Sequence, residues 1–426
     1  MRRHLIAGYV VIVLGFCFLS AQAQEQNTIG AGNQQAIELS RKSTVVQRSY
    51  RFLLSQAAKI HNPLVRKETE DAIANPKTCI QHRANLTQQD KQRILENLVK
   101  AGLIVVEDQT AFPGGLMAGV FPPVNDDGSA CPHLPQPFLS APGSEFGGHH
   151  SYPGGLAIHE AKNEMAAVNL ASDYRNTYGE SYGKGSAKPG QSDVFIDEDV
   201  VMAAPIWHDW AKAIVFQWNK DGTEFKELNF GGNGAADNNS SAGNSKTGAH
   251  HILGLAETMK RGFDPVLVIT QASAHAVPTM GNEFKVVNWL RAAAIIAQID
   301  PVEKGYLTTD KHGRLRLPPV RKLSTLDLLN ADPPQTNLIA EYTIHNLSDS
   351  DFILSTPAIT TVQIILRELA PEFGFDANDT ASYNNGFRNP VLSFLTAERL
   401  LMIYGNKGLQ GVRNELRQLR VRKLLQ

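Results

Sequence analysis

The sequence predicts a mostly α-helical protein with a small β-hairpin. Apolar residues recur at helical spacing in segments along the whole chain, and only one pair of short apolar segments flanks a turn-forming Asp-Gly. We find no internal repeat of fixed period. With 426 residues, of which 42% are hydrophobic and 19% charged, the chain can bury a large core and can hold more than one domain.

The first 23 residues have the pattern of a secretory signal peptide. Two arginines precede an apolar run over residues 5–19, and small residues follow it. The run is shorter than the roughly 20 residues that cross a bilayer. We therefore predict cleavage near Gln24 and a periplasmic or secreted protein without stable membrane insertion. A lipoprotein anchored at Cys17 is the alternative, which the bulky Phe16 disfavours.

The charge balance argues against a polyanionic partner. Removal of the two arginines with the signal peptide would change the formal net charge from −1 to −3. Proteins that bind long nucleic acids are usually basic, so no long nucleic acid is expected as the main partner and a small substrate fits better.

Two cysteines, Cys79 and Cys131, remain after cleavage of the signal peptide. An even number of cysteines in an oxidising compartment is compatible with a disulfide. Two unpaired buried thiols are the alternative, and the spacing alone does not decide between them.

Residues 24–145 are predicted to form a helical N-terminal region with a Pro/Gly-rich linker. Residues 24–37 have the composition of a flexible leader. Helical spacing follows over residues 45–60, 64–74 and 90–101, with Thr87 introducing the last of these helices. Prolines and glycines over residues 112–148 exclude regular structure from most of that stretch, which either links two regions or wraps the surface.

Residues 146–304 are predicted to hold three elements before a polar loop. A helix opens at Pro153-Gly154-Gly155 and runs to residue 178, with Ile158, Met165 and Val168 on its buried face. A second helix is capped by Asp197 and continues through residue 212. Residues 213–218 and 224–230 then form the predicted hairpin around Asp221-Gly222. Residues 231–248 are almost entirely Gly, Asn, Ser and Ala, which predicts a mobile loop.

Three further helices are expected after that loop. Thr247 is predicted to cap a helix that carries His250 and His251, and a helix over residues 265–274 leads to His275. A helix over residues 286–299 is expected to stop at Asp300, because the following proline disfavours helical geometry there. For residues 305–426 we predict helices near 361–369 and 392–404 and a basic tail over 413–423, as a helical C-terminal region.

Six residues of metal-ligand type occur at helices or helix ends over about 140 residues, and we predict that they converge on one metal cluster. Consecutive helical residues point about 100° apart, so His208 and Asp209 cannot present the same geometry to one ion, and Asp209 is expected to bridge two. The predicted ligands are His159, His208, Asp209, His251, His275 and Asp300.

The motifs in this region resemble the HD-domain metal-dependent phosphohydrolase superfamily, and most closely the HD domain of bacterial exoribonucleases. The resemblance covers residues 146–304 and rests on an ordered set of strings: Gly147-Gly148-His149-His150 with His159 beyond it, His208-Asp209-Trp210-Ala211-Lys212, a hairpin, and His250-His251-Ile252-Leu253-Gly254. There is no oligonucleotide-binding barrel signature before it, so nuclease activity is not carried over.

The resemblance implies an HD-type helical bundle in which those six residues ligate a pair of divalent ions, such as Mn, Fe, Zn or Mg. It assigns Lys212 to a phosphate contact and places His149 and His150 on the substrate side. The expected substrate is a small phosphoester, attacked in line by a metal-activated water with Asp209 and Lys212 as catalytic residues. The sequence departs from the family pattern near His275, where Ala274 and Ala276 replace a histidine and a glycine.

Several alternatives stay open. His250 could be the ligand in place of His251, Lys212 could cap a helix, and the His149-His150 pair could lie in a solvent-exposed loop. Two tryptophans beside the His-Asp pair are expected in the core or the pocket wall. At the level of function, the alternatives are a catalytically silent metal- or ligand-binding protein and a diiron HD-type oxygenase.

Overall fold

The computed structural model describes residues 29–179, 193–232, 245–279, 281–321 and 326–425. Helices dominate this part of the chain, and the only regular strands within it form two antiparallel two-stranded sheets, which confirms the predicted mostly-α fold with a small β element. The predicted signal peptide, residues 1–23, and residues 233–244 of the predicted mobile loop lie outside the described residues.

The N-terminal helices have well-defined starts. They are α1 (Asn33–Lys42), α2 (Thr44–Ala57), α3 (Pro63–Ala74) and α4 (Gln88–Lys100). Thr87 and Asp90 form a capping box at α4, as the sequence predicted for Thr87. The predicted leader is wrong from Asn33 onward, because α1 buries Ala36 and Ser40 against the rest of the protein.

The stretch between α4 and α7 is mostly irregular, as predicted. Its short helices are α5 (Asp108–Ala111), α6 (Gly115–Val120) and a 3₁₀ turn over Phe138–Ser140. Cys79 and Cys131 form a disulfide, with Cα atoms 5.5 Å apart. This separation is ordinary for a disulfide, and the bond ties this stretch to the segment after α3.

The long helix α7 (Gly155–Tyr178) forms where the sequence predicts it, but it buries a different face. Met165 and Val168 are 44% and 40% exposed, so only Ile158 of the predicted apolar stripe packs against the core. The buried side combines alanines with polar side chains, among them His159, Glu160 and Glu164. A helix that buries carboxylates and a histidine indicates a polar site rather than simple packing.

Helix α8 (Glu198–His208) is capped by Asp197, whose carboxylate accepts hydrogen bonds from the backbone N–H groups of Asp199 and Val200. The two tryptophans that flank the His-Asp pair are fully buried, as expected. Trp207 donates to Thr69 Oγ1 and Trp210 donates to the carbonyl of Ala72, so α8 is anchored to α3.

The predicted hairpin around Asp221-Gly222 forms only in part. Trp218 and Glu224 are bridged across the turn, and backbone N–H groups of Asn219 and Phe225 donate to Thr223 and Gln217, but residues Lys212–Val215 are helix α9. Strand β1 (Asn229–Phe230) pairs instead with β2 (Thr247–Gly248), and β3 (Thr308–Thr309) pairs with β4 (Leu315–Arg316). Helical turns of the backbone at residues 212–215 leave too short a first arm for a longer ladder.

Helices α10 (Ala249–Lys260), α11 (Pro265–Ala272) and α12 (Glu283–Ala297) follow in the predicted order. Two details differ. Gly248 occupies the N-cap of α10, and the Thr247 hydroxyl bonds His275 instead of capping the helix. Helix α12 ends before Asp300, because Gln298 adopts a left-handed conformation with φ 54°.

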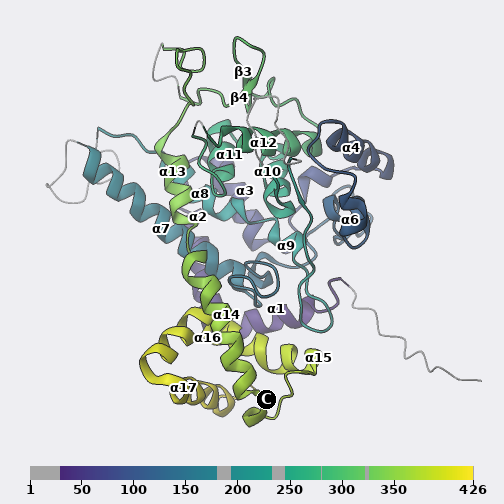
Figure 1. Cartoon of the computed structure of the whole chain (residues 1–426), viewed down its shortest axis with the longest axis vertical. Coiled ribbons are helices and arrows are strands. Elements are labelled where there is room, and N and C mark those ends of the chain that lie inside the picture. Colours follow the sequence, from purple (N-terminus) through teal and green to yellow (C-terminus); the bar gives the residue numbers. More distant parts are fainter. Residues whose placement is uncertain (1–28, 180–192, 233–244, 280, 322–325, 426) are drawn as a thin grey trace, which may run out of the picture.

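The C-terminal helices include one that carries the site and several that pack beside it. They are α13 (Ala340–Ser348), α14 (Phe352–Leu369), α15 (Thr380–Tyr383), α16 (Asn389–Leu395) and α17 (Ala397–Val421). In Figure 1, α14 descends from the α13 end of the molecule to the group formed by α15, α16 and α17. Helix α17 covers most of the predicted basic tail. By length and composition alone, the stretch Ala340–Phe373 is one candidate for crossing a membrane, and 39% of its most apolar window is buried.

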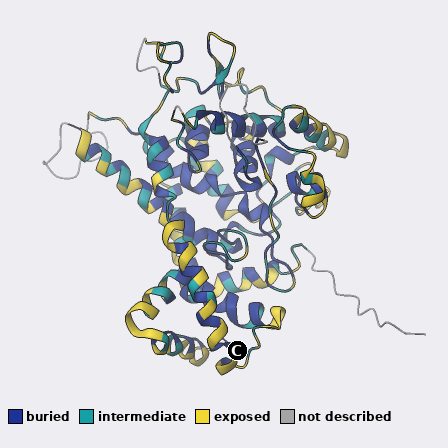
Figure 2. Ribbon diagram, in the orientation of Figure 1, coloured by how far each residue is buried: buried dark blue, intermediate teal, exposed yellow. Residues whose placement is uncertain are grey.

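The hydrophobic core crosses the boundary expected at residue 145. One cluster extends from Val46 in α2 to Tyr342 in α13, so the N-terminal region and residues 146–304 share a single core. A second cluster joins α14 to α17 and includes Tyr152. Figure 2 shows the buried interior beneath an exposed outer face of α17.

Candidate metal centre

Four residues from three parts of the chain surround one point in the interior. His159 comes from the second turn of α7, and His208 and Asp209 come from the end of α8. Asp349 directly follows α13. Three of the four are buried and Asp349 is partly buried. We call His159, His208, Asp209 and Asp349 the first donor group.

The distances within the first donor group suit a bound ion. Asp349 Oδ1 lies 3.1 Å from His159 Nε2 and 3.3 Å from His208 Nε2. Asp209 Oδ2 lies 3.3 Å and 3.4 Å from the same two nitrogens. Neighbouring ligands that sit about 2.0–2.1 Å from one ion at tetrahedral or octahedral angles are themselves about 2.9–3.4 Å apart. These four atoms could therefore hold a metal ion.

A second donor group consists of Asp209, His250 and His275, whose ligand atoms lie within 4.8 Å of one another. Asp209 Oδ1 and His250 Nε2 are 3.3 Å apart, yet both are buried and neither has a hydrogen-bond partner. Buried polar atoms without partners are costly. A metal ion bound by both atoms would satisfy them, so this second group could also hold a metal ion.

Hydrogen bonds at Nδ1 orient three of the four histidines in the two groups, whereas Nδ1 of His159 has no hydrogen-bond partner. His208 Nδ1 donates to the carbonyl of Pro205 at 2.8 Å, and His250 Nδ1 donates to the carboxylate of Glu227 at 2.7 Å. His275 Nδ1 bonds Thr247 Oγ1 at 2.8 Å. Metal-ligating histidines usually have their second nitrogen held in this way, which leaves Nε2 for the ion.

The ionisable groups of the first donor group shift one another's pKa values. Burial alone would raise the pKa of Asp209, but His208 and Lys212 hold it well below its usual value. Burial likewise would raise the pKa of Asp349, and His208 and His159 hold it well below the usual range. For His208, burial lowers the pKa, while Asp209 and other carboxylates raise it further, to about 9. The carboxylates are thus ionised at neutral pH, and a bound cation would replace the proton on His208.

Glu160 is a buried carboxyl group beside the first donor group that the sequence analysis did not single out. Its oxygens lie 3.6 Å from His208 Nδ1 and 4.0 Å from His159 Nε2, and neither has a hydrogen-bond partner. Burial raises the pKa of Glu160 to about 8, although His208 and His159 lower it. Its place directly after His159 on a polar helix face is the signal that could have identified it.

Of the six ligands predicted from sequence, the structure brings four together: His159, His208, Asp209 and His275. Asp300 is not among them. It is exposed, and its carboxylate accepts hydrogen bonds from the N–H groups of Val302 and Glu303 in the turn after α12. The carboxylate in the site is Asp349 instead, about 50 residues further along the chain.

The prediction of His251 as a metal ligand is also wrong, and His250 is the histidine that faces Asp209. The ring of His251 stacks on His275 with centroids 4.1 Å apart, and it belongs to none of the groups whose atoms converge as metal ligands among the described residues. Successive residues of α10 point in different directions, so only one of the two histidines can face Asp209. His250 was the alternative that the sequence left open.

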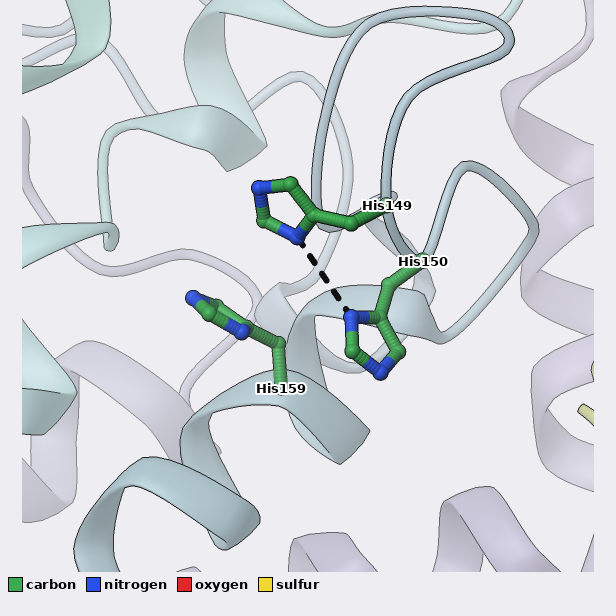
Figure 3. Close-up of side chains that lie close together, drawn as sticks. All are labelled: His149, His150 and His159. Carbon is green, nitrogen blue, oxygen red and sulfur yellow. Dashed lines mark hydrogen bonds between the residues drawn. The ribbon is translucent and has the colours of Figure 1, made fainter. Parts of the chain in front are cut away.

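His149 and His150 lie beside the site rather than in a fully exposed loop (Figure 3). Their Nδ1 atoms are 3.4 Å apart, and with His159 they form a further group that could hold an ion. His150 is 2% exposed, with φ 53°, and its carbonyl accepts a hydrogen bond from the N–H of Gly143. A Cβ at Gly155 would lie 1.9 Å from that carbonyl, which explains the glycine at the start of α7.

Lys212 lies in the pocket and is held by the protein itself. Its ammonium forms an ion pair with Asp209 and donates to the carbonyl of Gly143 at 2.5 Å. It therefore does not cap a helix end. A cavity of about 540 Å³ extends outward from Asp209 and Lys212, and its wall includes His149, Lys246 and Thr247.

No protein-family model, curated protein or solved structure matches this chain. The candidate site therefore rests on its own geometry.

Proposed function

We propose that this protein is an exported metal-dependent phosphohydrolase that cleaves a small phosphoester with two divalent ions. The observation that carries the proposal is the position of Asp209 between the two donor groups. Its Oδ2 faces His159 and His208, and its Oδ1 faces His250 at 3.3 Å without a hydrogen bond. One carboxylate with an oxygen in each group can bridge two ions.

The residues fit divalent transition metals by their chemistry. Imidazole and carboxylate donors suit Zn, Fe and Mn. The first donor group offers four protein ligands, and the second offers three, which leaves room for water or substrate at the second ion. Bound ions would lower the pKa of a coordinated water and polarise a phosphoryl oxygen.

The protein's own residues would position the substrate. Lys212, His149 and Lys246 all line the pocket beside Asp209. An ammonium group beside the bridging carboxylate favours a phosphate oxygen and stabilises negative charge that develops in the transition state. The partly closed pocket limits the access of bulk water to the reacting group.

Metal analysis and phosphate release together test this proposal. We expect two equivalents of a divalent metal in the purified protein and release of inorganic phosphate from at least one small ester. Asp209→Asn should lose both ions and the activity while keeping its helical circular dichroism. A metal-free, inactive wild-type protein would instead favour a silent binding protein. Full metal content in the Asp209→Asn variant would refute the bridge.

One observation favours a second candidate function. Asp209, His250 and His275 form a set of two histidines and one carboxylate with open positions, which is typical of non-haem iron oxygenases. Under this alternative, the protein holds iron and consumes dioxygen with its substrate. An oxygen electrode distinguishes the two functions, because a phosphohydrolase releases phosphate without oxygen uptake.

A further inference from the structure

The segment that supplies Asp349 also carries a group of exposed apolar side chains. Leu347 precedes the ligand and Phe352 follows it at the start of α14, and both line the same cavity as the metal donors. Leu347 is 46% exposed and Phe352 is 49% exposed. The cavity wall therefore contains both the metal donors and two apolar side chains, which lie on either side of Asp349 in the chain.

Two more exposed apolar side chains follow Phe352 on α14, outside the cavity wall. Phe352, Ile353 and Leu354 are consecutive and are 49%, 69% and 44% exposed. None of them, nor Leu347, belongs to a hydrophobic cluster formed by the described residues. Runs of three exposed apolar residues are unusual on a soluble surface unless they bind something. We call Leu347 and Phe352, the two of these residues that line the cavity, the apolar rim.

We infer that the apolar rim binds the alkyl part of the substrate, so that the natural substrate is the phosphoester of a long-chain alcohol. This inference rests on the proposed function, which places the phosphate at the two donor groups. Phe216 and Ala274 add apolar surface to the cavity wall. A chain attached to a phosphate bound near Asp349 would leave the cavity past Leu347 and Phe352.

A polar leaving group fits this edge less well. A sugar or nucleoside needs hydrogen-bonding partners, and the side chains of Leu347 and Phe352 offer none. The amide nitrogen of Asn346, beside the rim, already donates to the carbonyls of Ser273 and Ala274 at 3.2 Å and 2.7 Å. Contact between the rim and an alkyl chain, in contrast, favours binding, because each methylene group that leaves water lowers the free energy of the complex.

The test compares alkyl phosphates of increasing length, all below their critical micelle concentrations, with the Mn²⁺-loaded protein. We expect kcat/KM to rise about twofold to fourfold for each methylene from methyl to hexyl phosphate, which gives a hexyl-to-methyl ratio of about 30 to 1000. The double variant Leu347→Ser/Phe352→Ser should bring this ratio close to one. Ile364→Ser is the matched control, because Ile364 is 69% exposed on the same helix but does not line the cavity, and it should keep the ratio.

Calorimetric binding separates the failure of this inference from the failure of the proposed function. If no alkyl phosphate is hydrolysed but hexyl phosphate binds at least tenfold more tightly than methyl phosphate, the proposed reaction is wrong and the rim assignment stands. Equal affinities would overturn the assignment. It would also be overturned if the double variant changed only the oligomeric state or the binding to phosphatidylcholine vesicles, because the rim would then contact a second copy or a membrane surface.

Discussion

Replacement of Asp349 by asparagine is the most direct test of the metal centre, because no sequence pattern pointed to this residue. Asp349 Oδ1 lies within 3.3 Å of Nε2 of both His159 and His208. Asparagine preserves the size of the side chain and removes its charge. The substitution therefore tests the donor chemistry with little change in packing.

The expected loss can be bounded from the position of Asp349. Removal of an outer-shell partner of a metal ligand costs about 10-fold to 100-fold in affinity. Asp349 contacts the ligand nitrogens directly in the first donor group, so its loss should reach or exceed the upper limit. We expect the affinity for the more tightly bound ion to fall at least about 100-fold, which corresponds to about 2.8 kcal/mol.

Chelator competition against a metal indicator measures this affinity, and circular dichroism verifies the fold. Asp300→Asn is the matched control: the same substitution at the exposed carboxylate that the sequence favoured. It should leave metal affinity unchanged, because Asp300 bonds only the backbone of its own turn in the described hydrogen-bond network. Metal affinity in Asp349→Asn within threefold of the wild type, or a large loss in Asp300→Asn, would refute this assignment of the site.

Three further predictions concern the second ion, a buried ion pair and the disulfide. His250→Ala should reduce the metal content from two ions to one, whereas His251→Asn should keep two with weaker binding, because His251 only supports His275; equal metal loss in both variants would contradict the assignment. Glu257→Gln should lower the free energy of unfolding by about 3 kcal/mol at pH 7 in urea titrations, because it removes the buried carboxylate that Arg261 and His82 share, while Arg261 keeps its ion pair with Glu68. Burial alone would raise the pKa of Glu257, but Arg261 and His82 have the larger effect and lower it from an ordinary 4.5 to about 2. The contribution of Glu257 to the free energy of unfolding is therefore complete above pH 4.5 and is lost as the pH falls toward 2. The variant should lack this part of the acid dependence, and parallel acid-unfolding curves for the variant and the wild type would contradict the argument. The Cys79–Cys131 bond closes a loop of 52 residues, so its reduction should lower the free energy of unfolding by about 4 kcal/mol in a chain-entropy treatment. The unfolding midpoint should therefore fall when reductant is added, and an unchanged midpoint would show that the bond does not constrain the unfolded chain.

Local sequence was sufficient for the helices and for part of the site. Caps such as Asp197 and Thr87 act on backbone groups two or three residues away, so their role is visible in the sequence itself. The adjacent pair His208-Asp209 and Lys212, one helical turn later, are also close in the sequence, so their proximity in space could be predicted from it. The donor types alone also indicated a cluster that could hold a metal ion.

The errors occur where the partners are distant in sequence. Asp349 is 140 residues beyond Asp209, and nothing near it in the chain reveals that α13 packs beside α7 and α8. The sequence favoured Asp300 because it lies at a helix end, but a left-handed residue at 298 ends that helix early and leaves the carboxylate exposed.

The choice between His250 and His251, and the buried face of α7, have the same origin. Both residues of the pair are histidines, so composition cannot distinguish them, and only the rotation of α10 against its neighbours directs His250 toward Asp209. On α7, Met165 and Val168 face outward, because the face that carries His159 lies against Asp209 and Asp349. The sequence by itself determined the helical character of the chain and the chemical type of its donors; the tertiary structure alone decided which donors meet, because a shared coordination sphere depends on packing between elements far apart in the chain.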